Sequence, residues 1–291
     1  VDPGPGFGFE DALAEDPEGN EPSTILDAFH RFSWDFGSAR IGIAGHQVVT
    51  RLNNMFTLAD AFPALGWHNA DFLQNNMALF ADFEWVPASG LIISGVGGLD
   101  DFSAKSVGLG DSGVPTIWAY VLGADLFVPV SGSIWGIALE HGATHYLWGN
   151  YDGEVTMALD PNPLSRMLYR YTRDGGAVLL PLTSPYGPGA TWLAMRSRYA
   201  PKDGCVRFGV DALVLFRNSQ ASLVGTVYED SPTVAQALKT FHSSFRAMIQ
   251  VTSGAFMVSL SPQIVVAGDS VSFELGFVTT LRYQQEFSQI E

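Results

Sequence analysis

Glu140-His141-Gly-Ala-Thr-His145 brings two histidines and an acid close together in the sequence. Imidazole and carboxylate groups are zinc ligands, and two histidines four positions apart on a helix can share one ion. Gly142 and the flanking Trp135 and Trp148 favour a strand followed by a loop instead. Residues four apart on a strand share a face but lie too far apart for one ion. We therefore predict no metal site and no cofactor.

Two overlapping glycine-rich patterns fall in one segment. Gly110-Asp-Ser-Gly113 matches the residues around the nucleophile of chymotrypsin-like serine proteases, with His46 or His68 as candidate bases. In those enzymes the serine falls late in the domain, whereas most of this chain follows Ser112. Gly108–Gly113 also fits a dinucleotide-binding pattern, but a strand-like run follows it where a helix is needed to meet the phosphate. A surface turn explains both patterns.

Carboxylates and tryptophans raise the question of carbohydrate chemistry. Asp100-Asp101 and Asp152-Gly-Glu154 are paired acids of the kind that glycosidases use. Neither pair forms the compact arrangement on one strand that sandwich-type glucanases need, and solvated loops explain both. Trp135, Trp148 and Trp192 are candidate platforms for stacking sugar rings, although core or subunit contacts explain them equally. We predict that the protein is not an enzyme.

Composition limits the class of protein. Of 291 residues, 47% are apolar and 15% charged, which excludes disorder and indicates an uncharged surface that partners cover. The formal net charge is −15 and the basic residues are scattered, so a nucleic acid is not a direct partner. The single Cys205 favours synthesis in a reducing compartment. No run of eighteen apolar residues occurs, which predicts no membrane span.

Strands separated by turns dominate the rest of the chain. Every second residue from Val206 to Phe216 is apolar, and Arg207 and Asp211 lie at positions between them. This is the pattern of a strand with one face in a core and one face in water. Pro87–Gly90 and Gly268-Asp269 have the residues of tight turns. The predicted strands are 25–36, 40–49, 77–86, 91–96, 116–130, 133–139, 154–159, 177–182, 191–199, 206–216, 257–266 and 271–283.

Two helices are also expected. Residues 55–65 have the spacing of a short helix, and 231–249 have an N-cap serine, a proline at the first helical position and apolar residues at helical spacing. The whole pattern predicts an all-β fold, an antiparallel eight-stranded jelly-roll sandwich with one or two short helices and an extended N-terminal tail.

The chain divides into two parts. Residues 1–22 form an acidic, Gly- and Pro-rich N-terminal arm, and residues 23–291 form the sandwich domain. Phe7 and Phe9 are the predicted anchors of the arm, either on a neighbouring subunit or on its own domain. If the arm interlocks subunits, deleting residues 1–22 is expected to lower assembly and leave the isolated fold intact.

Three segments resemble the capsid proteins of picornavirus-like viruses. They are NNMALFADFEWVPASGLIISGVGG at 75–98, GADLFVPVSGS at 123–133 and GAVLLPLTSPYGPGATWLAMRSRYA at 176–200. The start without methionine and the end at Gln289-Ile-Glu291 also resemble ends cut from a polyprotein.

The resemblance implies a structural protein of an icosahedral shell. Its partners would be copies of itself and sister capsid proteins, with the genome contacted only indirectly and a host receptor bound by exposed loops. It would assemble in the host cytoplasm and reside in the virion. The alternative is a carbohydrate-binding or carbohydrate-active β-sandwich protein.

Overall fold

The structure is a computed structural model, and it describes a large part of the chain. No helix that is long and apolar enough to cross a membrane occurs in this part. The described residues are 7–10, 23–52, 75–101, 116–149, 151–152, 168–173, 176–181, 184–202, 205–218, 226–227, 239–253 and 256–281.

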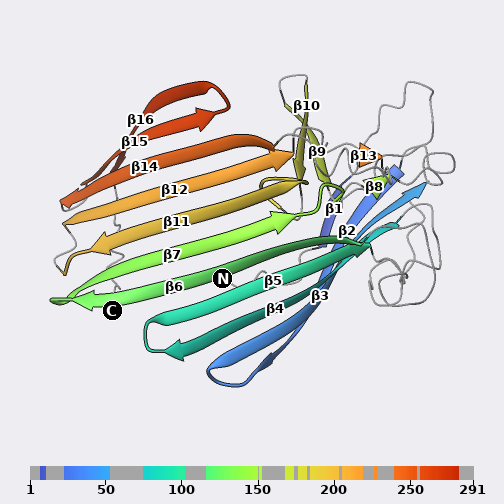
Figure 1. The fold of residues 1–291 in the computed structure, drawn as a ribbon, viewed down its shortest axis with the longest axis horizontal. Helices are drawn as coiled ribbons and strands as arrows, with labels where there is room; N and C mark the ends of the chain where they lie inside the picture. The colour runs from blue at the N-terminus through green and yellow to red at the C-terminus, as the bar shows by residue number, and fades with distance from the viewer. Residues whose placement is uncertain are drawn as a thin grey trace, which may run out of the picture.

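A single twelve-stranded sheet organises the described residues (Figure 1). Its strands are β1 (Phe7–Glu10), β2 (Ser23–Asp35), β3 (Ala39–Leu52), β4 (Asn75–Ala88), β5 (Leu91–Asp101), β6 (Ile117–Val130), β7 (Ser133–Thr144), β11 (Ala190–Ala200), β12 (Val206–Asn218), β14 (Lys239–Ser253), β15 (Phe256–Ala267) and β16 (Ser270–Leu281). Two small sheets accompany it, formed by β9 (Leu168–Arg173) with β10 (Gly176–Pro181) and by β8 (Tyr151–Asp152) with β13 (Thr226–Val227).

The large sheet is an antiparallel meander. Its order follows the sequence from β1 to β16, and only the two small pairs are left out. Short turns join β2 to β3, β4 to β5, β6 to β7 and β15 to β16. At the β6–β7 turn both Ser131 and Gly132 have positive φ, at 49° and 82°, as a two-residue hairpin turn of type I′ requires. No pairing between the described strands joins β1 to β16, so the sheet is open.

The all-β prediction is confirmed, but the eight-stranded jelly roll is wrong. A jelly roll passes its strands between two packed sheets by long connections, whereas here sequence neighbours pair within one sheet. The helix expected at 231–249 is also wrong from Lys239 onward, where β14 begins. Phe241, Phe245 and Ile249 are four apart, and this even spacing puts them on one face of a strand as well as of a helix. The expected helix at 55–65 and strand at 154–159 lie outside the described residues.

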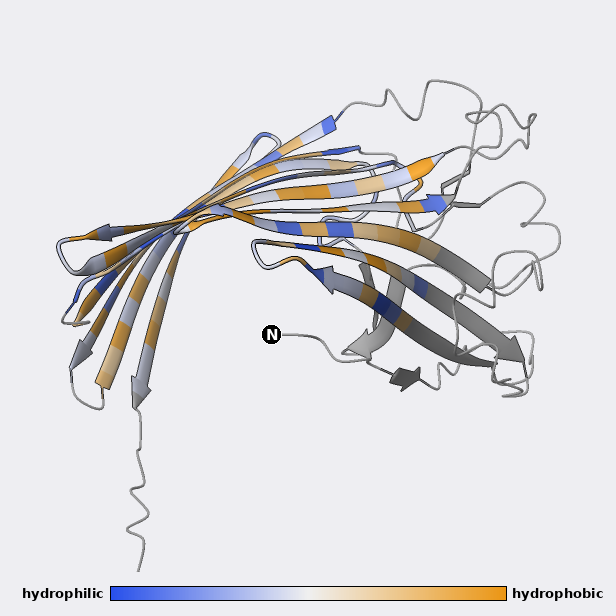
Figure 2. Cartoon of the chain, turned by 90° about the horizontal axis from the view of Figure 1, so that it is seen from below, coloured by the Kyte–Doolittle hydropathy of each residue, from blue (hydrophilic) through white to orange (hydrophobic). Residues whose placement is uncertain are grey.

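The two faces of the large sheet differ in character, because nearly all the charged residues lie on one of them and most exposed large hydrophobic residues on the other. Directly paired residues share a face and successive residues alternate, so the register assigns every side chain to one side. One side, the polar face, carries Arg31, Asp35, Arg40, Asp82, Glu84, Asp100, Asp125, Glu140, Arg196, Arg198, Arg207, Asp211, Arg217, Arg246 and Glu274. Along the strands, hydrophobic and hydrophilic positions alternate visibly (Figure 2).

The other side, the apolar face, is built from large hydrophobic residues. Those more than about a third exposed include Trp34, Ile43, Phe83, Trp85, Trp118, Leu122, Trp135, Leu139, Leu193, Phe208, Phe216, Phe245, Ile249, Leu260, Phe273 and Phe277. Among the side chains that the structure describes, Lys239 at the start of β14 is the one charged residue at an apolar-face position. The sequence analysis predicted a core for the Val206–Phe216 side of β12, and this is wrong. Phe208, Val214 and Phe216 are exposed.

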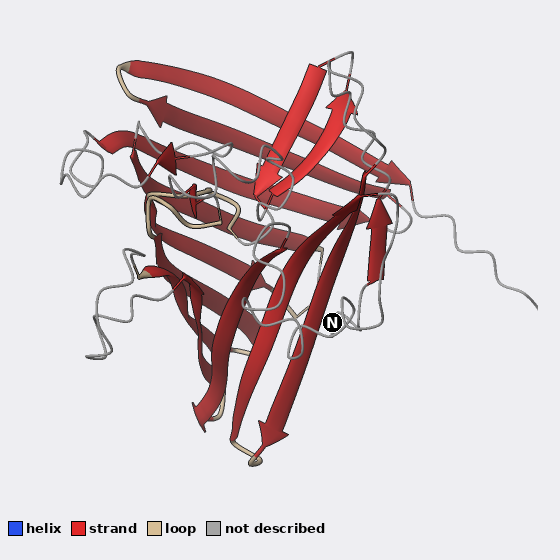
Figure 3. Ribbon diagram, turned by 90° about the vertical axis from the view of Figure 1, so that its right-hand side faces the viewer, coloured by secondary structure: helices blue, strands red, loops and turns tan. Residues whose placement is uncertain are grey.

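The buried core is small and lies over the polar face at one end of the strands. Residues 145–149 and 184–189 fold back there, and Ile117, Leu147 and Pro188 are completely buried. Thr144 ties the two segments together, because its Oγ1 donates to the Gly187 carbonyl at 2.8 Å and accepts from the Ala190 N–H at 3.0 Å. The sheet curves around these segments (Figure 3). The core therefore stabilises one end of the sheet, and in the described part of the chain most large hydrophobic side chains of the apolar face are exposed.

His145 in this core makes a pH dependence testable. Burial lowers its pKa from 6.5 to about 4, and its Nδ1 accepts a hydrogen bond from the Leu147 N–H at 3.3 Å. Between pH 6.5 and 4 the unfolded chain binds a proton there and the folded chain does not, so stability falls as the pH drops through this window. His145→Asn keeps an acceptor without the titration. We expect the midpoint of urea unfolding to fall from pH 7.5 to pH 4.5 in both proteins. The fall is expected to be smaller in this variant than in the natural chain. An equal difference would exclude His145 as the cause.

A candidate ligand-binding hollow on the polar face

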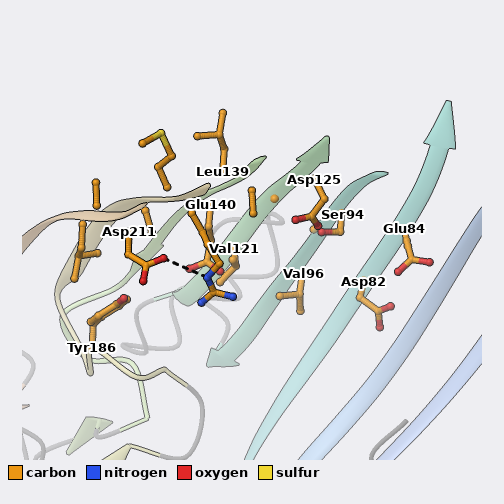
Figure 4. A pocket seen from close by; sticks show the side chains of 18 of the residues that line it. Asp82, Glu84, Ser94, Val96, Val121, Asp125, Leu139, Glu140, Tyr186 and Asp211 are labelled. Carbon is orange, nitrogen blue, oxygen red and sulfur yellow. Dashed lines mark ion pairs between the residues drawn. The ribbon is translucent and has the colours of Figure 1, made fainter. Parts of the chain in front are cut away.

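A hollow of about 620 Å³ lies on the polar face and extends from β3 to β14. Its floor consists of small residues on four adjacent strands: Ser94, Gly123, Ala138 and Ala194. Ser94, Gly123 and Ala194 fall in one transverse row of the register, which also holds Glu140. Short side chains there leave space above the sheet, while longer charged side chains rise around it (Figure 4).

The side of the hollow formed by β4, β6 and β7 is acidic. Asp82, Glu84, Asp125 and Glu140 line it. Arg40 pairs with Glu84 at 3.3 Å, and Glu140 Oε1 accepts a hydrogen bond from Trp192 Nε1 at 2.7 Å. We call these four residues the acidic wall. Carboxylates held in this way accept hydrogen bonds from hydroxyl groups of a ligand.

The opposite side is basic. Asp211 on β12 lies between Arg196, Arg198 and Arg246, at nitrogen–oxygen distances of 3.6, 2.7 and 3.2 Å. Arg198 also donates to the carbonyls of Ser197 and Val210, so its position is fixed by the backbone. Arg196 and Arg246 line the hollow. Together with Arg198, which pairs with the same carboxylate, we call them the basic wall.

Tyr186 stands beside the hollow on the segment that covers the end of the sheet. Its ring lies 4.9 Å from that of Trp192, at an angle of 56°. Burial and the negative charge of Glu140 raise its pKa above the ordinary value of 10. The phenol therefore remains protonated at neutral pH and can donate a hydrogen bond into the hollow.

The structure separates the residues that suggested a metal. Glu140 and His141 are adjacent on β7, so they point to opposite faces. His141 lies on the apolar face, where its Nδ1 is 3.4 Å from the Tyr120 hydroxyl. No group of potential metal ligands occurs among the residues that the structure describes.

The protease candidates are not brought together either. His46 is buried on the polar face, with its ring 6.2 Å from that of Phe29. Ser112 and His68 lie outside the described residues, as does the whole of Gly108–Gly113.

The proposed carbohydrate residues lie apart from the hollow. Trp135 is on the apolar face and donates to Ser197 Oγ, while Trp148 and Trp192 are almost completely buried. Trp192 contributes instead by orienting Glu140.

The two acid pairs were expected in solvated loops, and for Asp100-Asp101 this is wrong, because both belong to β5. Asp100 accepts a hydrogen bond from the Gly149 N–H at 2.8 Å, which holds the covering segment to β5. Asp101 pairs with Ile117 beside an irregularity in the register. Asp152 belongs to β8, and Glu154 lies outside the described residues.

The N-terminal arm is described only at Phe7–Glu10. This backbone pairs with Ile25–Ala28 of β2, within the same chain. The anchoring role of Phe7 and Phe9 and the division at residues 22 and 23 remain predictions.

The hollow was not foreseen in the sequence because its residues come from different strands. Asp125 stands between Ala124 and Leu126 and belongs to no motif of catalytic or ligand-binding residues. The alternation of polar and apolar residues along each strand is the signal that could have revealed the hollow. Each charged residue that lines the hollow interrupts an apolar run, and it does so at a polar-face position.

Comparison with known proteins adds a likeness of fold. No protein-family model and no curated protein sequence matches the chain. A solved structure that is similar to it is Wzi, described as an outer membrane protein involved in group 1 capsule assembly in Escherichia coli and as a carbohydrate-binding β-barrel. The TM-score is 0.57 at 11% identity, over 93% of this chain and 53% of Wzi. The chain thus spans about half the length of Wzi, and at this identity the two share a fold.

Proposed function

We propose that this chain is a membrane protein whose apolar face contacts lipid and whose polar face binds carbohydrate. The observation that carries the proposal is the division of the large sheet into two faces, with charge on one and uncovered hydrophobic side chains on the other. Proteins in water rarely expose apolar patches of more than a few hundred Å². The strands of transmembrane barrels have this alternation, because lipid and an aqueous interior meet their opposite sides. In a bilayer the edge strands β1 and β16 would also need pairing partners, since unpaired backbone groups do not occur in hydrocarbon.

The length of the strands fits a bilayer. The strands from β4 to β16 in the large sheet have 11 to 15 residues, and a tilted strand needs about 9–11 to cross the hydrocarbon. On the apolar face, Trp118 is near one end of β6, and Trp135 pairs with Val128 near the other. The ten residue-to-residue steps from Trp118 to Val128 span roughly 33 Å along the strand, or about 25 Å at the usual tilt.

Aromatic residues gather where the two lipid–water interfaces would lie. Trp34, Trp85 and Trp135 are close to the short turns at one end of the sheet. Trp118 and Tyr120 stack at 5.9 Å near the other end of β6. Tryptophan and tyrosine favour both interfaces, since their rings are apolar and carry one polar group. The two belts support a fixed depth in the membrane.

Carbohydrate is the ligand class that the polar face suits best. The hollow combines carboxylate acceptors, guanidinium donors and a protonated tyrosine, which together can bind hydroxyl groups from several directions. Wzi, which shares the fold, is described as carbohydrate-binding.

Membrane insertion is tested by refolding the chain with preformed phospholipid vesicles. We expect the protein to float with the vesicles in a density gradient and to resist extraction by carbonate at high pH. Carbonate removes proteins held only by surface charge, so release into the soluble fraction would contradict insertion.

The shell-protein hypothesis remains a prediction that no comparison tests. In that case sister subunits, rather than lipid, would cover the apolar face. Closed particles that form without detergent or lipid would support it and count against the membrane proposal.

A further inference from the structure

We propose that the basic wall of the hollow binds the carboxylate of an acidic sugar, so that the ligand is a uronic-acid-containing glycan. This inference rests on the proposed carbohydrate binding and specifies the ligand. The observation behind it is the uneven distribution of charge across the polar face.

Acids and bases occupy different halves of that face. The charged residues on β2–β7 are mainly acidic: Asp35, Asp82, Glu84, Asp100, Asp125 and Glu140, with Arg31 and Arg40 paired to two of them. On β11–β16 they are mainly arginines: Arg196, Arg198, Arg207, Arg217 and Arg246, with Asp211 and Glu274 as the acids. The hollow lies across the boundary between the halves. It therefore favours a ligand with an anionic group at one end.

The basic wall has donors left for such a group. Asp211 is the only carboxylate paired with the three arginines in the described part of the chain. Arg198 uses its donors on Asp211 and on two backbone carbonyls. The side chains of Arg196 and Arg246 are 69% and 50% exposed, and each contacts Asp211 through one nitrogen. A guanidinium has five N–H donors, and its planar fork matches a carboxylate.

The acidic wall fixes the direction of the ligand. Asp125 and Glu140 would repel a carboxylate but accept hydrogen bonds from sugar hydroxyls. A uronic acid carries both groups on one ring, so its carboxylate can face Arg196 and Arg246 while its hydroxyls face the acids. The net charge of −15 opposes unspecific binding of polyanions, which makes the local arginines necessary.

The test uses oligosaccharides of galacturonic, glucuronic and mannuronic acid, each paired with its neutral methyl ester. Affinity is measured by calorimetry on the full chain in detergent micelles. We expect at least one acid to bind about tenfold or more tightly than its ester, since charge-assisted hydrogen bonds are lost in the ester. The preference is expected to weaken as salt rises.

Arg196→Gln combined with Arg246→Gln is expected to abolish the preference for the acid. Arg207→Gln is the matched control, because it removes an arginine from the same half of the polar face at a position that does not line the hollow. Equal circular dichroism spectra would show that each variant is folded.

The outcomes separate the two claims. Equal binding of acid and ester, or an undiminished preference in the double variant, would overturn the carboxylate site and leave carbohydrate binding in place. Absence of binding by every acid and ester to the folded protein would overturn both.

Discussion

Replacing Leu260 by arginine is expected to destabilise the chain in lipid vesicles by about 2–4 kcal/mol, because the charge would stand near the middle of the hydrocarbon layer. Leu260 lies near the centre of β15 on the apolar face and is 40% exposed. In water the same substitution at an exposed site changes stability by less than about 0.5 kcal/mol. Urea unfolding in vesicles, followed by tryptophan fluorescence, gives the difference.

Ser259→Arg is the matched control, one residue earlier on the same strand. Ser259 pairs with Gln250 and Val278 and lies on the polar face. We expect this arginine to meet water and to leave the unfolding free energy nearly unchanged. Equal effects at the two positions would contradict the assignment of the faces.

Replacing Gly142 by alanine is expected to destabilise the fold by about 3 kcal/mol. Gly142 pairs with Trp192 on β11, and the indole ring lies directly over the glycine. A Cβ at residue 142 would overlap this ring, which is only 2% exposed and has little room to move. The shift would also break the bond from Trp192 Nε1 to Glu140 and leave a buried donor unpaired. The midpoint of urea unfolding measures the loss.

Gly97→Ala provides the control for the loss of a glycine within a strand. Gly97 lies on the apolar face, and a Cβ built there has no heavy atom within 4 Å. We expect unchanged or slightly increased stability, because alanine restricts the unfolded chain more than glycine does. A loss as large as that of Gly142→Ala would show that the effect does not come from Trp192.

The sequence allowed the strands to be predicted, because alternation and turn residues act locally. Most strands of the large sheet were anticipated, and the turn at Gly268-Asp269 joins β15 to β16 as expected. The assignment of β14 as a helix failed because Phe241, Phe245 and Ile249 satisfy both periods. Strand pairing across the sheet was not predictable, since local patterns do not specify which strands become neighbours.

The meaning of the alternation was also not available from the sequence. Val206, Phe208 and Val210 on one side of a strand show that its two sides meet unlike environments. The same pattern results whether the apolar side packs in a protein core or faces lipid. The prediction of no membrane span relied on long apolar runs, and a strand places its apolar residues at every second position. The hollow depended on strand order, which brings Asp125, Arg196 and Arg246 to one row.

The most direct test of the account is a spin-label scan of β14 in lipid vesicles. Cys205 is the only cysteine, so Cys205→Ser gives a background for single cysteines at positions 241 to 250. Labels at odd positions are predicted to collide mainly with oxygen, which concentrates in lipid, and labels at even positions with a water-soluble nickel complex. The account predicts that the nickel complex reaches labels at even positions more readily than labels at odd positions. If it reaches both equally, or the odd positions more readily, the apolar face does not face lipid.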